Sequence, residues 1–106
     1  MKEKKIFKGV GTAIITPMKE DGSINEAVFK YLIKRQIDEG ADAVVVAGTT
    51  GEASTLSDEE HLRLVECAVG TVQGRIPVIA GAGSNDTAHA IFMEKECEKL
   101  KADAIL

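Results

Sequence analysis

Short apolar runs recur along this chain at nearly regular intervals. Four such runs, rich in valine, isoleucine and alanine, lie at residues 10–15, 43–47, 77–80 and 104–106. Val10, Val44 and Val78 are each 34 residues apart. Continuous apolar runs of this length are typical of strands that are buried on both faces of a parallel sheet. We therefore expect four short parallel strands.

Helical patterns fill the three intervals between the apolar runs. They begin near Ser23, at Ser57 and near Asn85, and the first two end at Gly40 and Gly74. Ser23 and Ser57 are each followed three residues later by a glutamate, which is the sequence pattern of a capping box. Glycine directly after a helical pattern is a common helix stop. The predicted order is therefore βαβαβαβ, with connections long enough for right-handed crossovers.

This order is typical of the α/β class, and two larger architectures have it in their N-terminal part. One is the TIM (β/α)8 barrel, and the other is a doubly wound sheet such as a flavodoxin-like binding module. A full barrel takes about 250 residues, whereas this chain has 106. We expect residues 1–106 to form a single partial domain with three βα units and a fourth strand. Its open edge strand also allows a non-catalytic partial barrel that associates with itself.

Composition and charge exclude several kinds of partner. The formal net charge is −4 and only four residues are aromatic, so we expect no nucleic-acid partner. No apolar run approaches the roughly 20 residues of a membrane span, and the N-terminus lacks the apolar stretch of a signal peptide. Cys67 and Cys97 lie far apart within helical patterns, where buried free thiols are expected. These features together predict a cytoplasmic protein.

The second apolar run ends in a turn of sequence Gly-Thr-Thr-Gly-Glu at residues 48–52. In α/β proteins, ligands bind in loops that follow the carboxyl ends of strands. Thr49 and Thr50 offer hydroxyl groups between glycines, which let the backbone approach a small carboxylate or phosphate closely. The alternative is a structural turn whose hydroxyls cap the next helix. We expect the carboxylate of Glu52 to hold the loop. The alternative role for this carboxylate is that of a general base.

Other candidate motifs are weaker or absent. The glycine-rich stretch from Gly81 has Asp86 where a dinucleotide fingerprint needs its third glycine, and no P-loop lysine closes the threonine turn. His61 and His89 are not spaced for a metal, and the acidic run at residues 58–60 is expected to compensate a helix dipole. The sequence therefore predicts neither a metal site nor a cofactor. All ten lysines lie away from the predicted strand ends, so no amine nucleophile is evident.

Three segments of the chain together resemble the dihydrodipicolinate synthase family. They are residues 13–18 (Ala-Ile-Ile-Thr-Pro-Met), 48–52 and 74–81 (Gly-Arg-Ile-Pro-Val-Ile-Ala-Gly). The likeness continues without gaps from about Phe7. It implies the N-terminal portion of a TIM barrel that condenses pyruvate with aspartate semialdehyde through a lysine Schiff base, in lysine and diaminopimelate biosynthesis. N-acetylneuraminate lyase of the same superfamily usually has serine at the position of Thr49, so the resemblance favours the synthase and leaves a lyase-type pyruvate aldolase as the alternative.

The resemblance also implies roles for the two threonines. Thr50 matches the residue that holds the pyruvate carboxylate, and Thr49 matches the middle hydroxyl of a catalytic proton relay between two tyrosines. In the family, those tyrosines and the Schiff-base lysine lie beyond the position of Leu106. The resemblance therefore implies that this polypeptide alone is inactive.

A regulatory site and an assembly are further implications of the resemblance. Some members bind lysine as a feedback inhibitor, and His61 and Asn85 match positions of that effector site. Asp58 and His89 stand where the inhibited type has a histidine and a glutamate. The family commonly forms homodimers and homotetramers, which predicts a homo-oligomer here.

Overall fold

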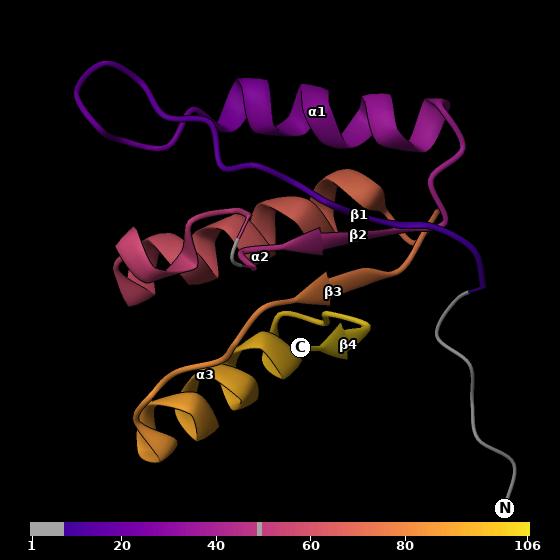
Figure 1. The fold of residues 1–106 in the computed structure, drawn as a ribbon. Coiled ribbons are helices and arrows are strands. Elements are labelled where there is room, and N and C mark those ends of the chain that lie inside the picture. The colour runs from indigo at the N-terminus through magenta and orange to yellow at the C-terminus, as the bar shows by residue number, and fades with distance from the viewer. Residues whose placement is uncertain (1–7, 49) are drawn as a thin grey trace, which may run out of the picture.

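The computed structural model describes residues 8–48 and 50–106, and these form one sheet with helices between its strands (Figure 1). The elements are β1 (Gly11–Ala13), α1 (Glu26–Asp38), β2 (Ala43–Val46), the 3₁₀ helix η1 (Ala53–Thr55), α2 (Asp58–Val72), β3 (Val78–Ala80), α3 (Thr87–Lys99) and β4 (Ala104–Ile105). The predicted order βαβαβαβ is confirmed. The short helix η1, which lies in the loop after β2, was not predicted.

All four strands run parallel, in the order β1-β2-β3-β4. Their register aligns Ala13, Val45, Ile79 and Ala104 in one row across the sheet. None of the strands contains a charged residue. The α/β fold class with parallel strands is therefore confirmed, and the Val/Ile-rich runs are its cause because they suit a sheet away from water.

The helices cover one face of this sheet. Figure 1 shows α2 behind the strands, with α1 on one side of it and α3 on the other. Phe29 of α1 and Leu64 of α2 are buried in one core cluster with Val44 and Val46 of β2. Met93 of α3 belongs to a second cluster that extends along β3 and β4. The core therefore lies between the sheet and this single layer of helices.

Both α1 and α2 begin where the sequence predicted, but the capping residue was predicted correctly only for α2. Ser57 and Glu60 form the expected capping box. The N-cap of α1 is Asn25, whose side-chain oxygen accepts a hydrogen bond of 3.2 Å from the backbone N–H of Val28. The predicted cap Ser23 instead donates to Asp21 at 2.6 Å. The bond to Asp21 engages the Ser23 hydroxyl in a turn before the helix, so Asn25 acts as the N-cap instead.

The C-terminal end of α2 also differs slightly from the prediction. The helix ends at Val72, and Gln73 adopts a left-handed backbone with φ of 51° before Gly74 continues the turn with φ of 77°. Cys67 and Cys97 are free and buried, as expected. Within the described ranges 8–48 and 50–106, no helix has both the length and the apolar character needed to cross a membrane.

Candidate functional site

The loops that leave the carboxyl ends of the strands meet at one rim of the sheet. The loop after β2 begins at Ala47, which has a φ of 56°, and reaches Glu52, which has a φ of 59°. Left-handed backbone is uncommon for residues other than glycine and marks a loop that its surroundings hold in place. Thr50 is exposed in this loop. Thr49 lies outside the described residues.

Thr16 fastens this loop to the end of β1. Its hydroxyl is buried and donates a hydrogen bond of 2.6 Å to the carbonyl oxygen of Gly51. A Cβ on Gly51 would come within 3.1 Å of both this hydroxyl and the carbonyl oxygen of Ile14. A side chain at Gly51 would therefore fit only if the end of β1 shifted by a few tenths of an ångström. No local signal in the sequence indicates the contact of Thr16 with Gly51, because the two partners lie 35 residues apart.

Gly81 connects the same loop to the end of β3. Its backbone N–H donates a hydrogen bond of 2.8 Å to the carbonyl oxygen of Val46. A Cβ at this position would overlap the backbone carbonyl of Ala47. The buried ring of His61 donates from Nε2 to the carbonyl oxygen of Gly81. The histidine on α2 thus holds the end of β3, and through it the loop after β2. His61 satisfies a backbone carbonyl here, a role that the sequence did not indicate.

The described contacts of Glu52 are with the short helix η1 that follows it. Its side chain is exposed and makes no capping hydrogen bond to η1, although Glu52 occupies the N-cap position of that helix. Its backbone carbonyl instead accepts a hydrogen bond of 2.8 Å from the hydroxyl of Thr55. The backbone, and not the carboxylate, therefore supports the start of η1.

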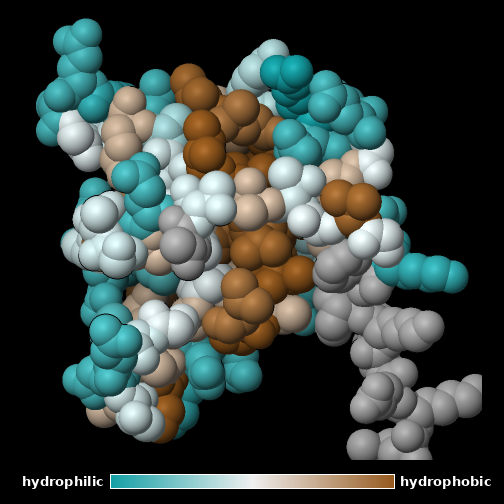
Figure 2. Space-filling model, in the orientation of Figure 1, coloured by the Kyte–Doolittle hydropathy of each residue, from teal (hydrophilic) through white to brown (hydrophobic). Residues whose placement is uncertain are grey.

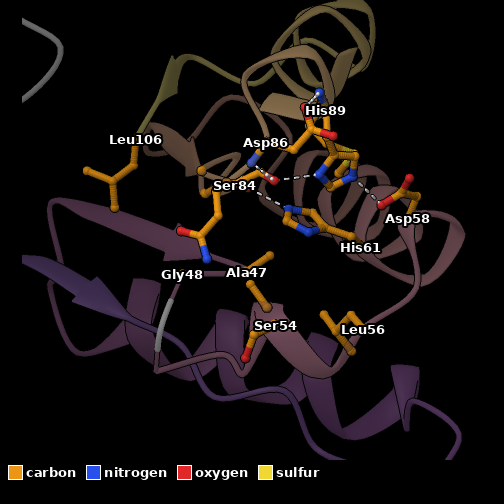
Figure 3. A pocket seen from close by; sticks show the side chains of 15 residues that line it. Ala47, Gly48, Ser54, Leu56, Asp58, His61, Ser84, Asp86, His89 and Leu106 are labelled. Carbon is orange, nitrogen blue, oxygen red and sulfur yellow. Dashed lines mark hydrogen bonds and ion pairs between the residues drawn. The ribbon is translucent and has the colours of Figure 1, made fainter. Parts of the chain in front are cut away.

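A cavity of about 780 Å³ lies beside the threonine turn (Figure 3). It shares Ala47 and Gly48 with the loop after β2, and both predicted effector residues, His61 and Asn85, line it. Its remaining walls come from η1 and the start of α2, from the loop after β3 and α3, and from the residue after β4: Ala53, Ser54, Leu56, Asp58, Gly81, Gly83, Ser84, Asp86, His89, Met93 and Leu106. The rim therefore has two neighbouring parts, the exposed threonine turn and this cavity.

His89 connects three segments at the wall of the cavity. Its Nε2 lies 2.7 Å from the Asp58 carboxylate, and its Nδ1 lies 2.9 Å from the Ser84 hydroxyl (Figure 3). Since a carboxylate accepts, Nε2 carries the proton, and in a neutral ring Nδ1 accepts from the serine. Asp58 was expected to compensate the dipole of α2, and it does lie in the first turn. The partnership with His89 was missed because 31 residues separate the two.

The polar groups described at the rim can bind a small ligand. Among the described residues that line the cavity there is no lysine, and Tyr31 is 62% exposed on α1. Within the described residues, no group of three or more His, Cys, Asp or Glu side chains is placed to hold a metal ion. The rim offers hydroxyls, amides and imidazoles instead. These groups can orient a small anion or a zwitterion.

Comparisons with known proteins identify the fold and then the family. The dihydrodipicolinate synthase of Aquifex aeolicus superimposes with a TM-score of 0.90 and 42% identity over 93% of this chain and 33% of that chain. The chloride-inhibited enzyme from Acinetobacter baumannii, solved in complex with pyruvate, gives a TM-score of 0.92 with 42% identity over 95% of this chain and 34% of its own. The chain thus has the fold of the N-terminal part of a TIM barrel.

The sequence comparisons define the family. The profile of the Dihydrodipicolinate synthetase family matches residues 6–106. The 4-hydroxy-tetrahydrodipicolinate synthase of Acetivibrio thermocellus is 52% identical over 103 residues, which cover 97% of this chain and 35% of that relative. The chain belongs to the Dihydrodipicolinate synthetase family. It spans about a third of the length of the relatives that it matches.

Proposed function

We propose that this chain supplies the pyruvate-binding rim of a 4-hydroxy-tetrahydrodipicolinate synthase. That enzyme would condense pyruvate with aspartate semialdehyde through a lysine Schiff base, in lysine and diaminopimelate biosynthesis. The observation that carries the proposal is the family match over residues 6–106, which includes the threonine turn after β2. The relatives bear the synthase name, which favours this reaction over that of an N-acetylneuraminate lyase.

In this proposal, Thr50 holds the carboxylate of pyruvate. An exposed hydroxyl beside backbone N–H groups of a tight turn can donate several hydrogen bonds to an anion. Thr49 acts as the middle hydroxyl of a proton relay, in which hydrogen-bonded hydroxyls polarise one another. The tie between Thr16 and Gly51 supports this role because it fixes the turn before a ligand arrives.

The chain alone is proposed to be catalytically inactive. Schiff-base formation needs a desolvated amine near the bound ketone, and in residues 8–48 and 50–106 no lysine lies at a strand's carboxyl end. Residues 1–106 would form one partial domain, with three βα units and the fourth strand of the barrel. The cytoplasm is the proposed compartment, since Cys67 and Cys97 are free thiols that a reducing environment preserves.

Trapping with borohydride tests the proposed reaction. A lysine amine attacks the pyruvate ketone, water leaves, and borohydride then delivers hydride to the resulting iminium to give a stable secondary amine. Intact-mass spectrometry should show no adduct on this chain. The Acetivibrio thermocellus relative, treated identically, should gain one reduced pyruvyl group and serves as the positive control. An adduct on this chain would contradict its inactivity, and no adduct on the relative would contradict the reaction assigned to the family.

We further propose that the cavity beside the turn is a weakened effector site. His61 and Asn85 line it, in keeping with the lysine-binding positions that the resemblance implies. The imidazole of His89, bonded to Asp58, stands where a glutamate would face the effector's ammonium group. We expect lysine to raise the melting temperature of this chain only slightly, and His89→Glu to enlarge that rise. An equal response in both proteins would contradict the assignment.

A further inference from the structure

The imidazole of His89 has a hydroxyl on one ring nitrogen and a carboxylate on the other. Its Nδ1 lies 2.9 Å from the Ser84 hydroxyl, and its Nε2 lies 2.7 Å from the Asp58 carboxylate. Asp58 begins α2, Ser84 lies in the loop after β3, and His89 lies in the first turn of α3. Three separate segments therefore converge at one wall of the cavity (Figure 3). Hydroxyl, imidazole and carboxylate in hydrogen-bonded series are the groups that activate a serine as a nucleophile.

The direction of these two hydrogen bonds suits proton transfer from the serine. An ionised carboxylate can only accept, so Nε2 of His89 carries the ring proton and Nδ1 accepts from the Ser84 hydroxyl. The two ring nitrogens have the reverse roles in serine proteases, but such a site is defined by the roles of its three groups. The distance of 2.9 Å lies within the reach of a general base. His89 is therefore placed to remove the proton of Ser84.

Asp86 holds the serine and the histidine in position. Its backbone N–H donates a hydrogen bond of 3.2 Å to the Ser84 oxygen, and this bond stabilises the negative charge that develops there when the proton leaves. Its carboxylate accepts from the backbone N–H groups of Ala88 and His89, at 3.0 and 3.4 Å, and so caps α3. The two reacting side chains are therefore oriented before a substrate binds.

Backbone donors for an oxyanion lie directly beside the serine. Among residues 8–48 and 50–106, no protein acceptor takes the N–H groups of Gly83, Ser84 and Asn85. Backbone N–H groups next to the nucleophile are typical donors of an oxyanion hole in acyl transfer. The side-chain amide of Asn85, which lines the same cavity, is a further donor of the kind used there. The loop after β3 thus offers both a nucleophile and donors for the charge that its attack creates.

The cavity indicates which acyl compounds fit the site. Its volume of about 780 Å³ holds a small molecule, and Leu56, Met93 and Leu106 give it an apolar wall. The left side of Figure 2, where the loops after the strands lie, is mainly hydrophilic. The carboxylates of Asp58 and Asp86 lie close to the serine and disfavour an anionic substrate. The site therefore suits an uncharged ester with a short apolar acyl chain.

We propose that Ser84, His89 and Asp58 hydrolyse such esters. The Ser84 oxygen attacks the ester carbonyl carbon while Nδ1 of His89 takes the hydroxyl proton. The tetrahedral intermediate then breaks its bond to the alcohol oxygen, and the alcohol leaves with that proton. Water attacks the acyl-serine in the same way, which releases the acid and restores the hydroxyl. Asp58 positions the imidazole and stabilises its protonated form. This activity shares the cavity with the proposed effector site but depends neither on lysine binding nor on the proposed synthase reaction.

Hydrolysis of p-nitrophenyl butyrate tests this proposal, with two serines as a matched pair. Ser84→Ala should lower the release of nitrophenolate about tenfold or more, because no acyl-serine can form. Ser23→Ala removes an exposed hydroxyl that is bonded to the Asp21 carboxylate instead of an imidazole, and should leave the rate unchanged. Asp58→Asn should lower kcat about tenfold or more with little change in KM, because Asp58 acts through His89. Circular dichroism checks that each variant is folded.

Labelling with a fluorophosphonate identifies the nucleophile. An activated serine displaces fluoride from this reagent, so intact-mass spectrometry with peptide mapping should place one adduct on Ser84 of the native chain and none on the Ser84→Ala variant. Three results would overturn the proposal. They are a native chain without an adduct at Ser84, hydrolysis that persists in Ser84→Ala because an imidazole is itself the nucleophile, and a loss of rate in Ser23→Ala equal to that in Ser84→Ala.

Discussion

Close backbone approach determines which single positions at the rim tolerate a side chain. Gly81→Ala would press a methyl group into the carbonyl of Ala47, which is backbone and cannot turn away. Relief requires the loop after β2 to shift relative to β3. We expect a loss of about 1–3 kcal/mol in the free energy of unfolding, as for overpacked interiors. Urea denaturation followed by circular dichroism measures it.

Gly83 provides the control for this substitution. It lies two residues further along the same loop, and a Cβ there would meet nothing within 4 Å. Gly83→Ala should therefore leave the unfolding midpoint nearly unchanged. Equal midpoints for the two variants would show that the close approach at Gly81 does not constrain the rim.

The hydroxyl of Thr16 provides a second test. Thr16→Val keeps the shape of the side chain and leaves the buried carbonyl of Gly51 without its partner. A buried unsatisfied carbonyl costs about 1–3 kcal/mol, so thermal unfolding should shift clearly downward. Thr55→Val removes a similar bond, of 2.8 Å to Glu52, at an exposed site where water can replace it. The tie between β1 and the loop would be contradicted if Thr55→Val were the more damaging change.

Sequence patterns identified the rim residues that carry a local signal. The two threonines were predicted as site residues because they follow an apolar run and lie between glycines. Thr50 is exposed in the loop after β2, and Thr49 lies outside the described residues. The contacts of Thr16 with Gly51 and of His89 with Asp58 span 35 and 31 residues. No periodicity encodes such contacts, because they depend on how the crossovers bring distant loops together.

For the helices, the N-cap was predictable where no neighbouring side chain bound the hydroxyl of the capping serine. Ser57 and Glu60 form their capping box as expected, whereas Ser23 lost the role to Asn25 because Asp21 binds its hydroxyl. Ser57→Ala should therefore lower the free energy of unfolding by about 1 kcal/mol, the usual value for an N-cap. Ser23→Ala, a change of the same chemistry outside the helix, should have a much smaller effect in the same denaturation experiment. A reversed order of the two would contradict the assigned caps.

The buried thiols of α2 and α3 make stability depend on alkaline pH. Burial raises the pKa of Cys67 and of Cys97 above the ordinary thiol value. Below that value both the folded and unfolded thiols are protonated and contribute no pH dependence. Above it the unfolded thiols ionise first, so stability falls as pH rises.

Denaturation between about pH 8 and about pH 10 measures this effect. The double variant Cys67→Ala, Cys97→Ala lacks both thiols, and we expect its stability to fall less steeply than that of the native chain over this range. Parallel pH profiles for the two proteins would show that the buried thiols do not contribute.

For the molecule as a whole, the order of elements along the chain was predicted from the sequence, and the layering was not. Apolar runs at a 34-residue spacing predicted parallel strands with intervening helices, and this order is observed. Runs that are apolar throughout do not say which face the helices will cover. Within the described residues, α1, α2 and α3 lie on one side of the sheet, as Figure 1 shows.

A pyruvate titration followed by the backbone amide resonances of the ¹⁵N-labelled chain tests most directly whether the threonine turn binds the keto acid. The largest shifts are predicted at Thr50 and Gly51, in the turn that the Thr16 hydroxyl holds. Thr50→Val should abolish them and Thr55→Val should leave them unchanged. No shift at the turn, or an undiminished shift in Thr50→Val, would contradict the assignment of this turn as the pyruvate carboxylate site.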